Sequence, residues 1–135
     1  MGGSLSRPED YCNPKKLLKL LFPFPDELLV DQFKFDKKDQ FLYYGCQSFW
    51  RLYQIATMML LHGRRLYFVH GTLGSGKSHM LAALACALIK SGKRVVYLLD
   101  CWGLLKAPFR YLCSALQLTF AKDKDCRHWQ YLDCS

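Results

Sequence analysis

Glutamate is almost missing from this chain of 135 residues, which contains only Glu9 and Glu27. Acidic residues of either kind are scarce between Arg51 and Lys122, where ten Lys or Arg accompany one acid, Asp100. The formal net charge is +8. A basic chain suits a partner that carries phosphates, such as a nucleotide or a nucleic acid. The basic residues alternate with apolar runs and form no block, so solvated basic faces are the plainer interpretation.

Other features that the sequence lacks argue against a membrane-spanning, a secreted or a zinc-binding protein. No apolar run approaches the ~18 residues that span a bilayer, and no secretory signal opens the sequence. The seven cysteines include no CxxC pair, which favours reduced thiols in an intracellular compartment, cytoplasmic or nuclear. Cys126, His128 and Cys134 lack the paired spacing of a zinc site. The opening Met-Gly-Gly-Ser-Leu-Ser matches the N-myristoylation pattern at Gly2, but so short a motif recurs by chance.

Prolines interrupt the first 40 residues, which we expect to form an irregular or helical arm. Within it, "KKLLKLL" (Lys15–Leu21) has the spacing of two helical turns with a basic face. We expect this segment to dock on the core. A nuclear-localisation element or a lipid-surface element is the alternative interpretation of the same residues.

Helical spacing of apolar residues recurs in the rest of the chain. It predicts one helix from about Gln47 to His62, which Gly63 would end, and another over Lys77–Lys90. Pro108 suits the first turn of a further helix.

Two short apolar runs flank the second of these helices. "LYFVH" (Leu66–His70) and "RVVYLL" (Arg94–Leu99) are rich in β-branched and aromatic residues, which is typical of buried strands. A strand, a helix and a second strand in this order predict a βαβ unit of a parallel sheet.

The candidate functional residues lie between the first predicted strand and the helix that follows it. "GTLGSGKS" fills every position of the Walker A pattern, G-x-x-x-x-G-K-[ST]. In such a loop, glycines let backbone N–H groups approach a polyphosphate, a lysine meets the outer phosphates and a hydroxyl reaches Mg²⁺. The candidate nucleotide-binding residues are Gly71, Thr72, Leu73, Gly74, Ser75, Gly76, Lys77 and Ser78.

Hydrolysis needs a second magnesium ligand and a group that orients water. Asp100, which ends "VVYLLD", looks like a Walker B acid, and with Ser78 it forms the candidate metal site. In kinase-like P-loop proteins the acid-bearing strand lies beside the P-loop strand. In AAA+ and RecA-like proteins another strand intervenes, and Asp100 would then be too far from the metal.

The residues from Leu66 to Cys101 resemble the opening of AAA+-type ATPases related to bacterial replication initiators and helicase loaders. They are more similar still to the NTPase module of Crinkler-type proteins of fungi and oomycetes, with "GT-G-GKSH-LAAL" and "G-RVVY--DC" in common. The similarity covers roughly Phe41 to Phe120. It implies ATP and Mg²⁺ as ligands, the P-loop glycines, Lys77 and Ser78 as nucleotide residues, and an outer-strand place for Asp100. The chain lacks a Crinkler header, and it ends before the Walker B strand, sensors and arginine finger of such families.

We therefore expect an α/β fold, with a P-loop NTPase-like βαβ core over 41–122, an arm over 1–40 and a polar tail over 123–135. The expected function is ATP binding by the N-terminal half of a larger ATPase, whose missing C-terminal part or a partner chain would complete it. One alternative is a small kinase-like enzyme that uses Asp100 as its magnesium acid. Another is a non-enzymatic, truncated interaction protein.

Overall fold

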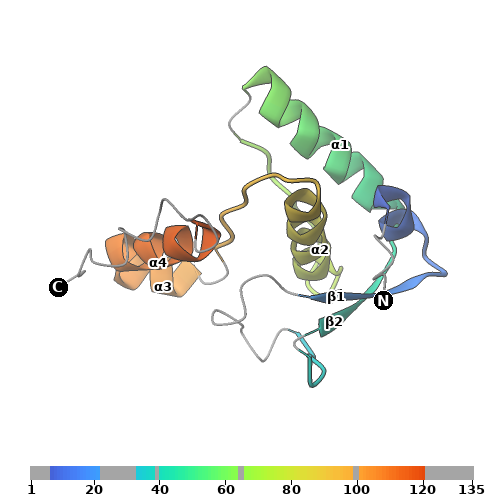
Figure 1. The fold of residues 1–135 in the computed structure, drawn as a ribbon, viewed down its shortest axis with the longest axis horizontal. Coiled ribbons are helices and arrows are strands. Elements are labelled where there is room, and N and C mark those ends of the chain that lie inside the picture. Colours follow the sequence, from blue (N-terminus) through green and yellow to red (C-terminus); the bar gives the residue numbers. More distant parts are fainter. Residues whose placement is uncertain (1–6, 22–32, 39, 64–65, 99–100, 121–135) are drawn as a thin grey trace.

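The computed structural model describes residues 7–21, 33–38, 40–63, 66–98 and 101–120, and the structural statements below concern these residues. They form a small mixed α/β chain with a two-stranded antiparallel sheet. Figure 1 shows the elements in chain order. They are the 3-10 helix η1 (Pro8–Cys12), β1 (Leu17–Leu21), β2 (Gln40–Tyr44), α1 (Gln47–His62), α2 (Lys77–Lys90), α3 (Cys101–Lys106) and α4 (Pro108–Phe120).

The sheet is a pair of strands in which Leu17 lies opposite Tyr44 and Leu21 lies opposite Gln40. Burial alternates along both strands, so that one face packs on the core and the other is exposed. The buried members are Leu18, Leu20, Phe41 and Tyr43. The prediction of helical turns over Lys15–Leu21 is therefore wrong. Pairing with β2 puts two leucines of this segment inside and leaves Lys19 outside, which a strand achieves because its side chains alternate between faces.

An aromatic cluster holds the N-terminal elements together. The ring of Tyr11 in η1 stacks on Phe49 of α1 with 5.0 Å between centroids, and Phe33 meets Phe41 edge-on at 5.6 Å. All four side chains are at most 1% exposed. The segment Lys15–Leu21, which we expected to dock on the core, belongs to it through Leu18 and Leu20, and the described residues before Gln40 also contribute Tyr11 and Phe33.

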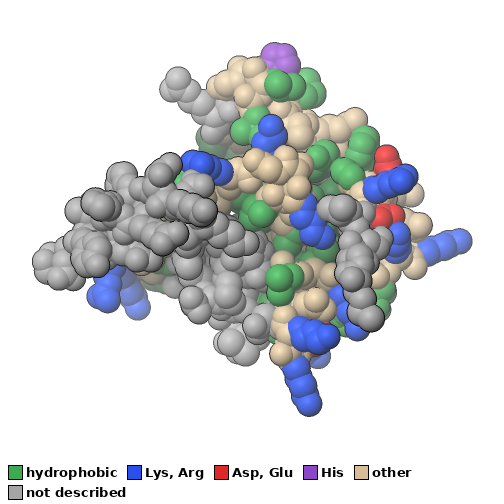
Figure 2. Space-filling model, in the orientation of Figure 1, with side chains coloured by type: hydrophobic (Ala, Val, Ile, Leu, Met, Phe, Trp, Pro, Cys, Tyr) green, Lys and Arg blue, Asp and Glu red, His purple; other side chains and the backbone are tan. Residues whose placement is uncertain are grey.

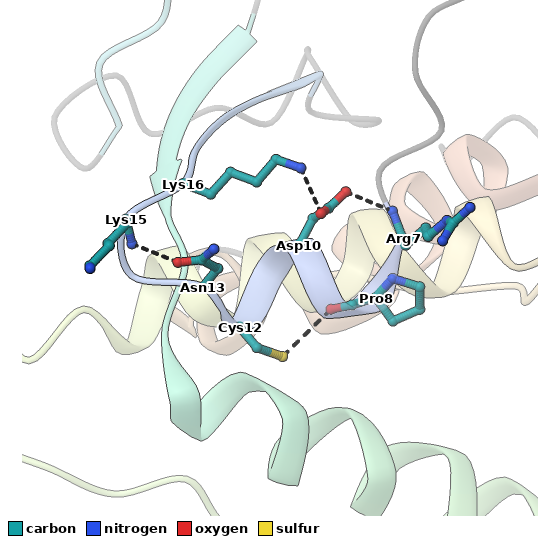
Figure 3. Close-up of polar contacts among 7 residues, drawn as sticks. All are labelled: Arg7, Pro8, Asp10, Cys12, Asn13, Lys15 and Lys16. Carbon is teal, nitrogen blue, oxygen red and sulfur yellow. Dashed lines mark hydrogen bonds and ion pairs between the residues drawn. The ribbon is translucent and has the colours of Figure 1, made fainter.

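Polar contacts fix the entry of the chain into β1 (Figure 3). The Asp10 carboxylate accepts hydrogen bonds from the Arg7 backbone amide at 3.1 Å and from Lys16 Nζ at 2.6 Å. The Lys16 hydrogen bond is the main reason that the pKa of Asp10 lies below its usual value. The Lys15 amide donates to Asn13 Oδ1 at 3.0 Å, which shapes the turn that follows η1. These exposed contacts set the direction of β1 and add little stability.

The helices over 47–62 and 77–90 are confirmed. Helix α1 ends at Gly63, which adopts the left-handed conformation with φ 66°. The most buried residues of α2 are small, which lets the helix approach its neighbours closely. They are Ala82, Ala83, Ala85, Cys86 and Ala87.

The segments 66–70 and 93–98, in contrast, belong to no strand in the described part of the chain. The expected burial of the first is not found, because Leu66 is 71% exposed and Phe68 is 75% exposed. A parallel strand needs cover on both faces, whereas α1 and α2 pack on η1 and on the β1–β2 pair. The parallel sheet stays a prediction. Leu99 and Asp100 lie outside the described residues.

Figure 1 shows α3 and α4 next to each other, on the side of the molecule away from the sheet. A helix from Pro108 is confirmed, and α3 is an addition to the prediction. The end of α4 touches the preceding segment, since Thr119 Oγ1 donates to the Val95 carbonyl at 3.1 Å and the Arg94 guanidinium lies 4.8 Å from the centre of the Phe120 ring. None of the described helices has the length and apolar character required to cross a membrane.

Candidate functional site

The glycine loop leads directly into α2. Gly74 and Gly76 have φ values of 79° and 77°, a conformation that side-chain-bearing residues rarely adopt. Gly76 occupies the N-cap position of α2, and its carbonyl accepts the first helical hydrogen bond, from the Met80 amide at 3.0 Å. The two glycines therefore turn the chain so that the loop meets the positive end of the helix.

Lys77 folds back over the loop that precedes it. Its Nζ donates to the carbonyl oxygens of Gly71 at 2.9 Å and Thr72 at 2.5 Å, and to Ser75 Oγ at 3.0 Å. A Cβ on Gly71 would stand 3.0 Å from Ser75 Oγ and 3.6 Å from the lysine side chain. The ammonium group is thus held at the mouth of the loop by neutral acceptors alone.

Several backbone donors of the loop have no acceptor. Within the loop only the Ser75 amide donates to a loop carbonyl, that of Thr72 at 3.3 Å. Among the described residues, no acceptor is found for the amides of Gly74, Gly76, Lys77 and Ser78. Consecutive free N–H groups at a helix start make a concave site for an anion. All loop residues from Gly71 to Gly76 are exposed, so such an anion can reach them from solvent.

Between residues 40 and 120, acidic residues are absent from the described sequence on both sides of the loop. No Asp or Glu occurs within the described stretches 40–63, 66–98 and 101–120. Figure 2 shows Lys and Arg side chains spread over the visible face, with acidic side chains confined to one side of it. The basic residues form no single patch on this face, so charge alone does not define a nucleic-acid surface.

Of the two candidate metal ligands, Ser78 and Asp100, the structure describes Ser78 alone. Ser78 is the second residue of α2, it is exposed, and its hydroxyl has no hydrogen-bond partner in the described part of the chain. Asp100 falls outside the described residues, so its distance from Ser78 stays untested. In the described stretches, no three His, Cys, Asp or Glu residues come together as a metal site.

A hollow beside the loop was not expected from the sequence. Its volume is about 410 Å³, and it lies where the end of β2 faces the start of α2. Its lining residues are Leu42, Tyr43, Tyr44, Cys46, Ser75, Gly76, His79 and Met80. No motif marks them. The one feature that could have indicated them is the alternation of side chains between the two faces of the strand, which leaves Leu42 and Tyr44 on its exposed face.

No family model, curated protein or solved structure matches this chain. The assignment of a function therefore depends on the loop, on its free donors and on the residues around them.

Proposed function

We propose that this chain binds the phosphates of a nucleoside triphosphate, ATP, through the loop Gly71–Ser78. One observation carries the proposal: the backbone N–H groups of Gly74, Gly76, Lys77 and Ser78 have no acceptor in the described part of the chain, and the Lys77 ammonium lies on oxygens of the same loop. Free backbone donors in a loop and at a helix start, with a lysine beside them, suit a polyphosphate.

Lys77 would change partners when phosphate binds. Its ammonium now donates to two neutral carbonyl oxygens and to the Ser75 hydroxyl. A phosphate oxygen carries a formal charge and accepts a stronger, charge-assisted hydrogen bond. The ammonium would move only a short way to reach a bound phosphate, because the same loop supplies both its present acceptors and the free amides. The present position of Lys77 therefore keeps the ammonium poised above the anion site.

Ser78 fits the role of a magnesium ligand. Mg²⁺ is bound mainly by water and substrate phosphates, with one or two protein oxygens, and the Ser78 hydroxyl is exposed and free. The metal would neutralise charge on the phosphates while this hydroxyl orients it. Asp100 is the candidate for the second protein ligand, in a kinase-like arrangement.

Hydrolysis is a separate question from binding. The described residues that follow the loop include no carboxylate that could orient water. We therefore favour a nucleotide-binding half-module of a larger AAA+-like ATPase, similar to the Crinkler NTPase module. A kinase-like enzyme that uses Asp100 is the alternative.

The proposed partner is the polypeptide that completes the parallel sheet. It would be the C-terminal part of a larger ATPase or a separate chain. The segment 66–70 supplies the support, because Leu66, Tyr67 and Phe68 are 71%, 48% and 75% exposed. No hydrogen bond in the described part of the chain involves the backbone of 66–70. A segment whose backbone N–H and C=O groups are unpaired can form a strand by pairing with one from another polypeptide. An intracellular compartment, cytoplasmic or nuclear, is part of the same proposal.

The test is Lys77→Ala in calorimetric titrations with Mg-ATP. Loss of the ammonium should weaken binding by about 1.5–3 kcal/mol, the contribution of a hydrogen bond to a charged group. Lys90→Ala is the matched control, because Lys90 is exposed at the opposite end of the same helix. Equal affinity of the Lys77 variant and the parent for ATP would overturn the proposed function.

A further inference from the structure

We propose that the hollow between β2 and the start of α2 receives the nucleoside part of the nucleotide, with the Tyr44 ring stacked on the base. This inference rests on the proposed function. It adds to that function a site for the base and a residue that binds it, neither of which the loop motif specifies.

The first support is continuity between the hollow and the phosphate site. Ser75 and Gly76 line the hollow and also belong to the loop, and His79 and Met80 continue the lining along the first turn of α2. A nucleotide whose phosphates lie on the free amides of Gly76 and Lys77 would place its sugar and base at this wall. The hollow measures about 410 Å³, which falls within the range of ligand sites in proteins, roughly 300–1,000 Å³.

The second support is the chemistry of the opposite wall. Leu42 and Tyr44 belong to the exposed face of β2, where they are 49% and 66% exposed. Tyr44 is among the residues that line the hollow, and an exposed aromatic ring is a platform on which a flat base can stack. Stacking uses the face of the base, so this wall accepts adenine or guanine without strong preference.

The third support is the rigidity of the site. The His79 ring packs 4.7 Å from the Phe33 centroid and 6.4 Å from the Phe41 centroid, and both phenylalanines are 1% exposed. Behind Tyr44, the Cys46 amide donates to the Tyr11 carbonyl at 2.9 Å, which ties the end of β2 to η1. The His79 ring and the backbone at the end of β2 are therefore held by the core on the two sides of the hollow.

The experiment compares two ligands, Mg-ATP and Mg-tripolyphosphate, on the parent and on Tyr44→Ala. Tripolyphosphate has the phosphates and no nucleoside. We expect Tyr44→Ala to weaken ATP binding about tenfold, within the range measured for base–aromatic stacking. Tripolyphosphate should bind both proteins equally. Tyr44→Phe, which retains the ring, should bind ATP as the parent does, and Trp102→Ala on α3 is a control for loss of an exposed ring elsewhere.

Each outcome decides between the two proposals. If the parent does not bind tripolyphosphate, the phosphate site itself is wrong. If tripolyphosphate binds but Tyr44→Ala leaves ATP affinity unchanged, the base does not stack on Tyr44 and the present inference fails alone. Equal weakening of both ligands would also overturn it, because Tyr44 would then act on the loop and not on the nucleoside.

Alkylation of Cys46 provides a second, independent measurement on the unmodified chain. Cys46 lines the hollow, and Cys101 is an exposed thiol on α3. ATP should slow the reaction of Cys46 with iodoacetamide at least severalfold, as followed by peptide mass spectrometry, whereas tripolyphosphate should not. The rate at Cys101 should not change with either ligand. Protection of Cys46 by tripolyphosphate to the same degree as by ATP would contradict a nucleoside in the hollow.

Discussion

The chain up to the end of α2 and the chain after it have similar apolar content, but nearly all the buried hydrophobic residues belong to the first. Before Lys90, residues from η1, both strands, α1 and α2 form one cluster of buried side chains. After Ala87, Ala115 is the one buried hydrophobic residue among those described. Trp102, Leu105 and Phe109 are 72%, 73% and 73% exposed. Hydrophobicity alone therefore does not decide burial in this molecule.

The difference lies in what each region has to pack against. The first region contributes aromatic rings from η1, β2 and α1 that meet one another within 5.0 to 6.2 Å. Buried apolar surface contributes about 25 cal/mol per Å², so these contacts stabilise the fold. In the second region, α3 and α4 pack on each other and α4 contacts the segment 93–98, from which Tyr97 packs against the core of the first region. The exposed apolar surface of this second region is thus the part of the chain that most needs a partner to bury it.

The largest effect should come from a truncation in the first region. Phe49 is fully buried between Tyr11 and Tyr53, so Phe49→Ala removes contacts and leaves a cavity. We expect a loss of about 3–5 kcal/mol in the free energy of unfolding, measured by urea denaturation. Trp102→Ala removes a larger ring from an exposed position and should change stability by less than about 0.5 kcal/mol. Similar losses for both variants would show that the two regions do not differ as described.

Gly76→Val should abolish nucleotide binding. A Cβ at this glycine meets no protein atom within 4 Å, so the harm comes from the φ of 77° and from the approach of phosphate. The conformational strain should cost roughly 1–2 kcal/mol of stability. Gly92→Val is the matched control, because Gly92 has φ 78° at the other end of α2. It should lose similar stability in thermal denaturation and still bind ATP in calorimetry.

High pH should disrupt the first region through its buried thiol. Burial raises the pKa of Cys86 from 9.0 to about 11. Below pH 9 the thiol is protonated in the folded and unfolded chains, and its contribution to stability is complete. As the pH rises from 9 to 11, only the unfolded chain loses this proton, so stability falls.

The midpoint of alkaline unfolding, followed by circular dichroism, should therefore move to higher pH in Cys86→Ala. Cys101→Ala is the control, since this thiol is exposed on α3. Burial also raises the pKa of Tyr11 to about 12, so part of the alkaline transition should remain in the Cys86 variant. An unchanged midpoint in Cys86→Ala would mean that this thiol is accessible in the folded chain.

The smallest expected effect concerns Asp100, which follows the segment 93–98 in the sequence. We expect ATP turnover by residues 1–135 to be near background in a steady-state phosphate-release assay, because no Glu follows the loop. Asp100→Asn should then leave the rate unchanged. Robust turnover that Asp100→Asn abolishes would contradict the half-module proposal and support the kinase-like enzyme.

Local signals in the sequence predicted the helices well. The bounds of α1 and α2 coincide with the apolar spacing, with Gly63 at one end and the glycine loop at the other. These features act within a few residues, so they can be recognised without knowledge of the rest of the fold. The segment Lys15–Leu21 was misassigned because "KKLLKLL" has apolar residues that suit either period, and its partner strand begins 19 residues after it ends.

The sequence by itself determined the glycine loop, its lysine and the helix that follows, because their chemistry depends on residue types at fixed short spacing. The tertiary structure decided which apolar residues became core, since burial requires a partner surface that distant segments supply. It joined β1 to β2, placed Tyr11 and Phe33 inside, and left 66–70 exposed. It also created the hollow beside the loop, because its lining residues from β2 and α2 come together only after these two elements pack.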